Sequence, residues 1–166
     1  MELKPGYKLT EVGVIPEDWD VKPLDTIFRF SGNVSASRAD LSHVGHPYLH
    51  YGDIHGTQST VIDVVAERDT IPRLNVPLSR VPKKALLEDG DVVFVDASED
   101  DDGASRHIVV RNPQGHPFIA GLHTIVAKSL DRSLDNDFKR FAFQSQAVRE
   151  QFKFYAVGTK VSGVSK

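Results

Sequence analysis

The fold of this chain is constrained most by a series of short β-branched runs in its second half. The runs are "DGDVVFVDAS", "RHIVVRN", "PFIAG" and "HTIVAKS", and turn-forming residues separate them. β-branched residues favour extended backbone, whereas Gly, Asn and Pro between them favour tight connections. The first run is entered through an Asp-Gly turn at Asp89 and Gly90. The pattern predicts four short strands joined by turns.

The first half of the chain also favours short extended segments. "VGVIPEDWDVKPL" predicts a strand, a turn at Pro16 to Asp18 and a second extended piece, with Trp19 covering the core beside the turn. "LDTIFRF" predicts a short helix, and "SGNVSASRAD" a polar loop. "HPYLHYGDIHG" alternates as a strand that ends at Gly52 and Gly56, and "STVIDVV" predicts the strand behind it.

A proline-containing segment from Arg68 to Lys84 interrupts the strand pattern. Pro72, Pro77 and Pro82 recur at a spacing of five. Proline lacks the N–H that a helix interior or an inner strand requires, so we expect neither a regular helix nor a central strand here. Long connections in compact domains are usually functional, and this one is therefore a candidate binding segment.

One amphipathic helix is predicted near the C-terminus, from Asn136 to about Val157. Asp135 or Asn136 is suited to cap its start, and Gly158 suits the position just past its end. The apolar positions that recur every three or four residues and should pack on the sheet are Phe138, Phe141, Val148, Phe152 and Tyr155. Arg149, Lys153 and Lys160 should stay outside. Short strands with marginal helices predict an α+β fold with a mixed or antiparallel sheet.

Composition is that of one globular domain without obvious chemistry. The chain has 166 residues, a formal net charge of −3 and no cysteine, which excludes disulfides and thiolate metal sites. Basic residues predominate after Asp137 and acidic ones before it, which suits either a solvated helix face or a contact with phosphate. No signal peptide or membrane-spanning stretch is evident, so we expect a soluble, cytoplasmic protein.

Seven histidines raise the possibility of a metal site. His43, His46, His50 and His55 lie close together in sequence, but on a strand His50 and His55 would face opposite sides, and no His-Glu-x-x-His motif occurs. "DASEDDDG", from Asp96 to Gly103, lacks the glycine and the glutamate that a calcium-binding EF-hand loop requires. We predict no bound metal, and keep a small β-rich metal-dependent enzyme that uses the four histidines as the alternative.

Motifs of nucleophilic catalysis and of nucleotide binding are also absent from the sequence. The chain has no Gly-x-Ser-x-Gly, Gly-x-Gly-x-x-Gly or Gly-x-x-x-x-Gly-Lys-Ser/Thr pattern. We therefore expect a binding protein rather than an enzyme, and no cofactor. A protein–protein adaptor that uses the acidic loop as its contact remains a third hypothesis.

Several phrases resemble the specificity subunits (S subunits) of type I restriction–modification systems. "TEVGVIPEDWDVKPLDTIF" at Thr10–Phe28 is similar to the opening of their domains, which have a Gly-Val/Ile-Ile-Pro-x-x-Trp phrase before a helix start. "YLHYGDI" at Tyr48–Ile54 resembles their aromatic Tyr-Ile-x-x-Gly-Asp-Ile segment. "DGDVVFVDASEDDDG" and "AGLHTIVAKS" resemble further core segments, and "AVGTKVSGVSK" resembles the joint to a long spacer helix. The likeness spans nearly the whole chain.

The resemblance implies a single target recognition domain, residues 1–157, followed by the start of the joint to a spacer helix, residues 158–166. Such a domain reads one half of a bipartite site in double-stranded DNA and catalyses nothing itself. Its implied partners are the methylation (M) subunits and the restriction (R) subunit of the same system, with no membrane contact. Because the spacer helix and a second domain do not follow, we expect an expressed fragment rather than a natural half-subunit.

Candidate DNA contacts are polar side chains in the predicted loops, because loops on a rigid sheet carry recognition residues. Those whose donors and acceptors suit base edges are Arg38, His55, Gln58, Arg73, Asn75, Arg80, Arg106 and His107. Those suited to phosphates are Lys83, Lys84 and Lys160. We expect a minority of them to touch bases, and a concave face that joins Arg38, Arg73 and Arg106 would favour DNA over the alternatives. The negative net charge predicts weak, salt-sensitive binding by the domain alone.

Overall fold

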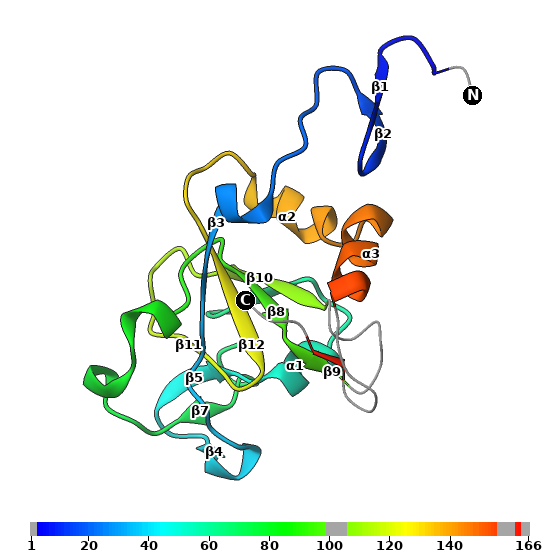
Figure 1. Ribbon diagram of the computed structural model, residues 1–166. Helices are drawn as coiled ribbons and strands as arrows, with labels where there is room; N and C mark the ends of the chain where they lie inside the picture. The colour runs from blue at the N-terminus through cyan, green and yellow to red at the C-terminus, as the bar shows by residue number, and fades with distance from the viewer. Residues whose placement is uncertain (1–2, 99–105, 156–161, 164–166) are drawn as a thin grey trace.

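The protein is described here by a computed structural model that covers residues 3–98, 106–155 and 162–163. It has the predicted α+β architecture, with several short sheets and few helices (Figure 1). All four strands predicted from the β-branched runs are present, as β8, β10, β11 and β12.

The largest sheet has five strands in the order β3-β12-β8-β10-β6. Its strands are β3 (Phe28–Ser31), β12 (Thr124–Ser129), β8 (Val92–Val95), β10 (His107–Arg111) and β6 (Val61–Asp63). Neighbouring strands are antiparallel except for β10 and β6, which are parallel. The sheet is therefore mixed, as the sequence predicted.

Both faces of this sheet are buried, which explains why its central strands are continuously apolar. In β8, Val93 and Val95 point into one hydrophobic cluster, and Val92 and Phe94 point into the cluster on the opposite face. The first cluster includes Ile54 from a short helix. The second is completed by the segments that follow β12. One face of the sheet thus supports the short helix, and the other supports the C-terminal helices.

The second sheet has four strands in the order β11-β5-β7-β4. They are β11 (Ile119–Ala120), β5 (His46–Leu49), β7 (Arg73–Leu74) and β4 (Leu41–Ser42). The prediction that no central strand lies within Arg68–Lys84 is wrong, because β7 pairs with both β5 and β4. The strand is possible because it consists of two residues and its flanking Pro72 offers only a carbonyl, which accepts from Tyr48 N–H.

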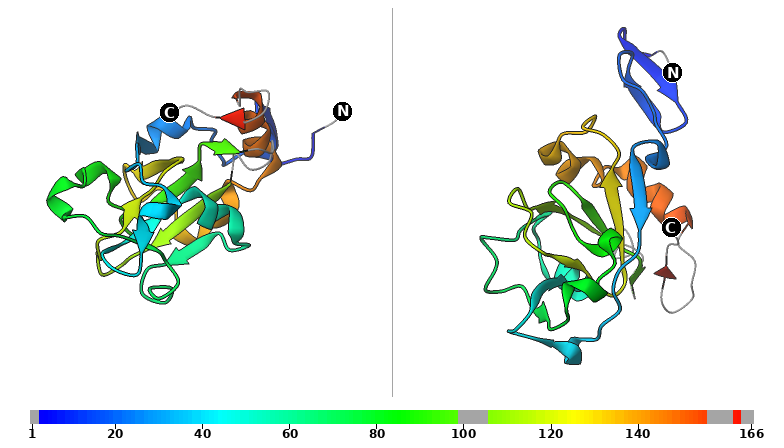
Figure 2. Two further views of the ribbon diagram at one scale, coloured as in Figure 1. Left: turned by 90° about the horizontal axis from the view of Figure 1, so that it is seen from below. Right: turned by 90° about the vertical axis from the view of Figure 1, so that its left-hand side faces the viewer.

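Prolines determine the backbone conformation in the remainder of the segment from Arg68 to Lys84. Pro77 and Pro82 immediately precede the 3₁₀ helices η3 (Leu78–Arg80) and η4 (Lys83–Ala85), as their N-cap residues. Their fixed φ angles suit the entry to a helical turn, and short 3₁₀ turns need few hydrogen bonds. The absence of a regular α-helix in this segment is confirmed. The two turns are the green helices at the edge of the globule in Figures 1 and 2.

The N-terminal residues form a hairpin of β1 (Tyr7–Thr10) and β2 (Gly13–Pro16). Figures 1 and 2 show this hairpin projecting away from the body of the domain. Trp19 is 55% exposed, so the prediction that it covers the core is wrong. Trp19 follows a hairpin that projects from the globule, which leaves its side chain largely open to solvent. The short helix predicted for "LDTIFRF" is present only as the 3₁₀ helix η1 (Leu24–Thr26), because Phe28–Phe30 belong to β3.

The predicted C-terminal helix is interrupted. It consists of α2 (Asn136–Ala142), capped by the Asp135 carboxylate, and α3 (Gln146–Tyr155). The break inserts Phe143 between Phe28 and Phe94, where its ring is buried. The interruption changes the phase of the helical face that meets the sheet.

The change of phase corrects the predicted packing of this region. Val148 and Phe152 pack on the sheet as expected, whereas Phe138 and Phe141 are 47% and 61% exposed. The Tyr155 side chain lies outside the described residues. Among residues 3–98, 106–155 and 162–163, no helix combines the length and apolar character needed to cross a lipid bilayer.

Two short elements complete the described structure. The strands β9 (Ala97–Ser98) and β13 (Ser162–Gly163) pair as a small antiparallel ladder. The 3₁₀ helix η2 (Arg38–Asp40) precedes β4, and the α-helix α1 (Tyr51–Gly56) follows β5. The predicted strand through Gly52 therefore ends at Leu49, and the argument that His50 and His55 face opposite sides of a strand does not apply.

Candidate functional site

The short helix α1 begins at a histidine cap. The His50 Nδ1 accepts a hydrogen bond from Gly52 N–H at 3.1 Å, and the Asp53 carboxylate accepts from His50 N–H at 3.1 Å through Oδ2. This reciprocal arrangement satisfies two backbone donors that the first turn would otherwise leave open. Burial and the charge of Arg38 lower the pKa of His50, which favours the neutral ring that an acceptor nitrogen requires.

Arg38 reaches α1 from the 3₁₀ helix η2. Its Nη2 donates to Asp53 Oδ1 at 2.7 Å. The turn that carries Arg38 is itself fixed, because Asp40 Oδ2 accepts from both the backbone N–H and the hydroxyl of Ser37 at 2.7 Å. These hydrogen bonds from Ser37 lower the pKa of Asp40. The position of Arg38 is therefore restricted both by the fixed turn that carries its backbone and by the hydrogen bond from its guanidinium to Asp53.

A buried tyrosine fixes the two loops beside α1. The Tyr48 hydroxyl donates to Val34 O at 2.7 Å and accepts from Ala36 N–H at 3.1 Å and from Leu122 N–H at 2.8 Å. Tyr48 is fully buried, and burial raises its pKa, so the hydroxyl stays protonated as the donor role requires. One hydroxyl therefore positions the loop before Arg38 and the turn between β11 and β12.

The turn between β11 and β12 needs a glycine where it passes β5. A Cβ at Gly121 would lie 2.3 Å from Leu49 O and 2.5 Å from the Tyr48 ring, so only glycine permits this approach. Two residues later, His123 has a φ of 57°, a conformation that non-glycine residues rarely adopt. Its Nδ1 lies 3.1 Å from Asp96 Oδ1, and its ring meets the edge of Tyr51. Strained backbone of this kind is concentrated at functional sites.

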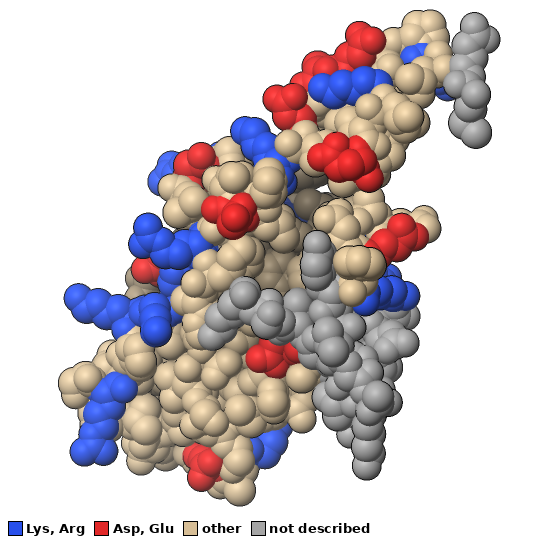
Figure 3. All heavy atoms as spheres, in the orientation of Figure 1, with Lys and Arg blue, Asp and Glu red and all other residues tan. Residues whose placement is uncertain are grey.

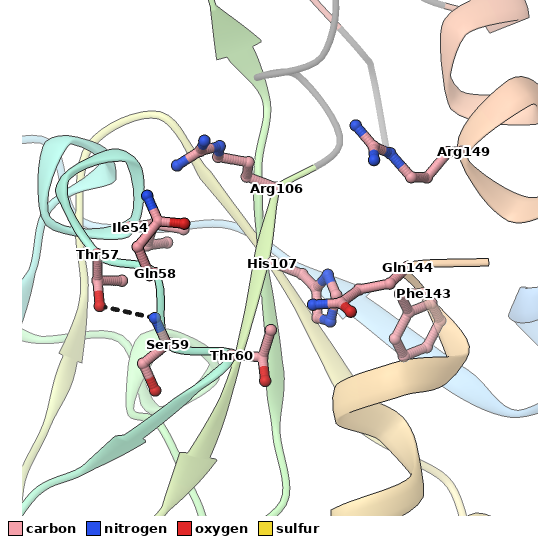
Figure 4. A pocket seen from close by; sticks show the side chains of 10 residues that line it. All are labelled: Ile54, Thr57, Gln58, Ser59, Thr60, Arg106, His107, Phe143, Gln144 and Arg149. Atoms are coloured by element: carbon pink, nitrogen blue, oxygen red, sulfur yellow. Dashed lines mark hydrogen bonds between the residues drawn. The ribbon is translucent and has the colours of Figure 1, made fainter. Parts of the chain in front are cut away.

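The other end of α1 is held by Arg106, whose Nη1 donates to His55 O at 2.8 Å. Arg106 and Gln58 line a hollow of about 380 Å³ between α1, the start of β10 and the start of α3. Figure 4 shows Arg106 and Gln58 on one side of this hollow, with Arg149 and Gln144 across from them. Two guanidinium groups and two amides give the hollow a polar lining that is rich in hydrogen-bond donors.

We refer to the polar side chains arranged around this helix as the α1 surface. It comprises Arg38, Tyr51, Asp53, His55, Gln58, Arg106 and His123. Sequence reasoning identified Arg38, His55, Gln58 and Arg106 but missed Tyr51, Asp53 and His123. The available signal was the resemblance of "YGDI", which contains Tyr51 and Asp53, to a family segment. The conformation of His123 has no such signal, because a positive φ at a histidine is not marked in the sequence.

The remaining predicted base contacts are either buried or outside the α1 surface. His107 is 7% exposed, its Nε2 lies 3.3 Å from Arg140 O, and its ring packs on Phe94 and Phe143, so burial removes it from the candidate contacts. Arg73 donates to Gly45 O and Arg68 O and lines a second hollow with His46 and His116. Arg106 and Arg73 line different hollows and neither lining includes Arg38, so the concave face joining these three arginines that would favour DNA over the alternatives is not observed among the described residues.

The predicted phosphate contacts Lys83 and Lys84, together with the predicted base contact Arg80, lie on a different side of the domain. Arg80, Lys83 and Lys84 are exposed on η3 and η4, and we call these three residues the proline edge. Figures 1 and 2 place these turns across the globule from α1, and Figure 3 shows basic side chains gathered on that side. Asn75 is exposed in the segment that leads to η3. Lys160, and residues 99–103 of the acidic loop, lie outside the described residues.

The four clustered histidines have separate environments. His50 caps α1, His46 pairs with Leu74 in the second sheet, His43 is exposed beside β4, and His55 meets the edge of Tyr51. In the part of the chain that the structure describes, no group of three or more His, Cys, Asp or Glu side chains is placed to hold a metal ion. No observation supports the metal-dependent enzyme.

The architecture places the chain among α+β domains that are built from several short sheets and few helices. A solved structure with this fold is the S subunit of a type I restriction–modification system from M. genitalium. It is 13% identical to this chain, with a TM-score of 0.50, and the match covers 87% of this chain and 30% of that one. At this identity the likeness shows the fold alone. No protein-family model and no curated protein matches the sequence.

Proposed function

We propose that this chain is a DNA target recognition domain of a type I restriction–modification specificity subunit. It reads one half of a bipartite DNA site and directs the methylation and restriction subunits to that site. The observation that carries the proposal is the likeness of fold to an S subunit over 87% of the chain. The sequence phrases near both ends of the chain point to the same family independently of the fold.

The α1 surface is the proposed base-reading surface. Arginine donors match the O6 and N7 acceptors of guanine, and the amide of Gln58 matches the N6 and N7 edge of adenine. Arg38 and Arg106 are held at opposite ends of one short helix, and Gln58 follows that helix directly. We retain Arg38, His55, Gln58 and Arg106 as base contacts. Arg73, Asn75 and Arg80 lie outside the α1 surface, and we do not assign them to its base contacts.

The proposed phosphate contacts are Lys83 and Lys84 on the proline edge, together with Lys160. Lysine is a mobile point charge that positions a protein on DNA without reading sequence. With a formal net charge of −3, the domain neutralises few phosphates, so binding by the domain alone is weak and decreases with salt. Tight binding requires the M subunits, whose chemistry this domain directs and does not perform.

The domain organisation is part of the same proposal. Residues 1–157 form the recognition domain, and residues 158–166 begin the joint to a spacer helix. The M subunits and the R subunit are the protein partners. The S subunit that shares the fold is longer, and the match covers 30% of it, which is consistent with a domain that functions within a larger subunit.

The proposal is tested by grafting residues 1–157 into a complete two-domain specificity subunit, in place of one of its recognition domains, and mapping methylated sites. The expected result is a bipartite site with one half replaced and the other half unchanged. The control is the parent subunit with its own domain excised and reinserted at the same junctions. A graft that assembles with its M subunits but leaves both half-sites unchanged contradicts the proposal.

A further inference from the structure

We infer that Arg38 reads a guanine within the half-site, and that Asp53 is the positioning residue that holds the Arg38 guanidinium for this contact. The inference rests on the proposed function, and it names one base and the pair of residues that selects it. It follows from three properties of the pair: the donors that the ion pair leaves open, the anchoring of both partners, and the exposure of the guanidinium.

The ion pair uses one Arg38 nitrogen and leaves a complete two-donor edge. A guanidinium has five N–H donors, two of them on Nη2. The contact with Asp53 Oδ1 is made by Nη2. If the carboxylate accepts the Nη2 hydrogen on the Nε side, Nη1 and Nη2 each keep an N–H, and these two N–H groups point in parallel. If the carboxylate accepts the other Nη2 hydrogen, Nε and Nη2 keep such a parallel pair of N–H donors. Either pair matches the O6 and N7 acceptors of guanine.

Asp53 is suited to hold the arginine because its other oxygen is already fixed. Oδ2 accepts from His50 N–H at 3.1 Å, while Oδ1 binds Arg38 at 2.7 Å. The carboxylate is therefore fixed to the first turn of α1 rather than placed at the end of a mobile side chain. Asp40 fixes the turn on the arginine side in the same way. A guanidinium held in advance loses less conformational freedom when it binds a base.

The exposure of the pair argues against a purely structural role. The Arg38 side chain is 51% exposed and that of Asp53 is 27% exposed. Exposed ion pairs add little to folding stability, so stability alone gives little reason for two fixed partners at this position. About half of the Arg38 side chain is therefore open to solvent, from which a base edge can approach it.

Gly52 provides a means of moving the guanidinium by a change within α1. A Cβ at this position would lie 3.0 Å from Arg38 Nη2 and 3.3 Å from His50 Nδ1. Alanine is otherwise favoured over glycine in a helix. The variant Gly52→Ala should therefore shift the arginine tip, which is the flexible end of its side chain, and a thermal melt checks that the fold with its His50 cap is kept.

The experiment selects bound duplexes from a pool with a randomised central segment, at low ionic strength, using the 166-residue chain. The variants are Arg38→Lys, which keeps the charge and loses the paired donors, and Asp53→Asn, which keeps an oxygen acceptor for His50 N–H and loses the carboxylate. Gly52→Ala is the third variant. The matched controls are Arg132→Lys and Asp131→Asn, exposed residues away from α1. Thermal melts check that each variant is folded.

We expect the unaltered chain to prefer guanine at one position. Arg38→Lys should reduce that preference by roughly five- to 150-fold, the range of one bidentate base contact, and leave the other positions unchanged. Asp53→Asn and Gly52→Ala should reduce it at the same position by about two- to tenfold, as the arginine must then be ordered on binding. The controls should match the unaltered chain.

Three outcomes contradict the inference. If the unaltered chain selects a sequence and Arg38→Lys leaves every position unchanged, the inference is wrong and the proposed function stands. A loss spread evenly over all positions assigns Arg38 to phosphate and overturns the inference in the same way. If the unaltered chain selects no sequence and its graft also leaves the methylated site unchanged, the proposed function and this inference are both wrong.

Discussion

The α1 surface and the proline edge both carry basic side chains, but they present these side chains differently. On the α1 surface each arginine is bound to a fixed acceptor: Arg38 to the Asp53 carboxylate and Arg106 to the His55 carbonyl. On the proline edge Arg80, Lys83 and Lys84 are exposed on two 3₁₀ turns. The two regions lie across the globule from each other (Figures 1 and 2).

We propose that this difference corresponds to two kinds of interaction. Reading a base requires donors held in a fixed geometry, and the α1 surface provides this through polar contacts from three separate loops. Attracting a phosphate chain requires only charge near the surface, which flexible lysines supply. Variants that disturb one region without the other therefore test whether the two roles are separate.

The largest effect is expected from Tyr48→Phe, which removes the hydroxyl that fixes the loops beside α1. The change leaves Ala36 N–H, Leu122 N–H and Val34 O without this partner in a buried site. We expect the free energy of unfolding to fall by about 2–4 kcal/mol, because each unsatisfied buried group costs roughly 1–3 kcal/mol. Urea unfolding measures it, with Tyr7→Phe in the projecting hairpin as the control. A loss no larger than the control's would show that the hydroxyl does not organise this side.

The next largest effect is expected from Arg106→Lys. Arg106 donates to His55 O and has further N–H groups in the hollow that it lines with Gln58. Lysine keeps the positive charge but lacks this planar set of donors. Discrimination between the preferred half-site and a site with one base changed should fall by about 1–3 kcal/mol. Competition binding with the two duplexes measures this difference, and Arg80→Lys on the proline edge should leave it unchanged. Equal effects of the two changes would remove the distinction between the regions.

Acid should destabilise the domain through its buried histidines His50 and His107. Burial lowers the pKa of His107, and also that of His50, below the ordinary value of 6.5. Below pH 6.5 the two histidines therefore bind protons in the unfolded chain more readily than in the folded chain. Their contribution to stability is complete above pH 6.5 and is lost as pH falls toward the folded-state pKa values, by up to about 1.4 kcal/mol per histidine per pH unit.

The variant His107→Gln tests this pH dependence. It keeps a side-chain N–H for the Arg140 carbonyl and removes the titration. Its free energy of unfolding should vary less between pH 7 and pH 5 than that of the unaltered chain, a window that spans the ordinary histidine pKa. His116→Gln, at an exposed position, is the control and should keep the original dependence. An unchanged pH dependence in His107→Gln would assign the effect to other groups.

The smallest effect is expected from Lys83→Ala combined with Lys84→Ala. Each lysine that neutralises a phosphate contributes about 0.9 to the slope of log affinity against log salt. The double variant should lower that slope by about 2 if both contact phosphate, and the preferred sequence should stay the same. Replacement of the exposed Lys22 is the control, and an unchanged slope would exclude the proline edge from the DNA contact.

The main sheet was the part of the fold that the sequence predicted best. β8, β10 and β12 are buried on both faces, so their apolar runs are continuous, and such β-branched runs between turn residues predict buried strands. The break between α2 and α3 was not predictable in the same way. It depends on the pocket that Phe28 and Phe94 offer to Phe143, a long-range contact that the helical spacing of Phe138, Phe141 and Val148 does not reveal.

The candidate site was predicted only in part. The polar side chains of the predicted loops identified Arg38, Gln58 and Arg106. The segment that forms α1 was predicted to be a strand, because six residues are too few to show helical periodicity. Its cap is a histidine, which is not among the preferred N-cap residues. The pairing of Arg38 with Asp53, fifteen residues away, depends on how η2 and α1 meet in the fold.

The central claim is that the α1 surface reads bases and the proline edge contacts phosphates. Its most direct test is the affinity ratio between the preferred half-site and a scrambled duplex, measured across a salt series for two double variants. Arg38→Lys with Arg106→Lys should collapse the ratio toward one and keep the salt slope, whereas Lys83→Ala with Lys84→Ala should keep the ratio and lower the slope. The opposite assignment, or a ratio that neither variant changes, would contradict the account.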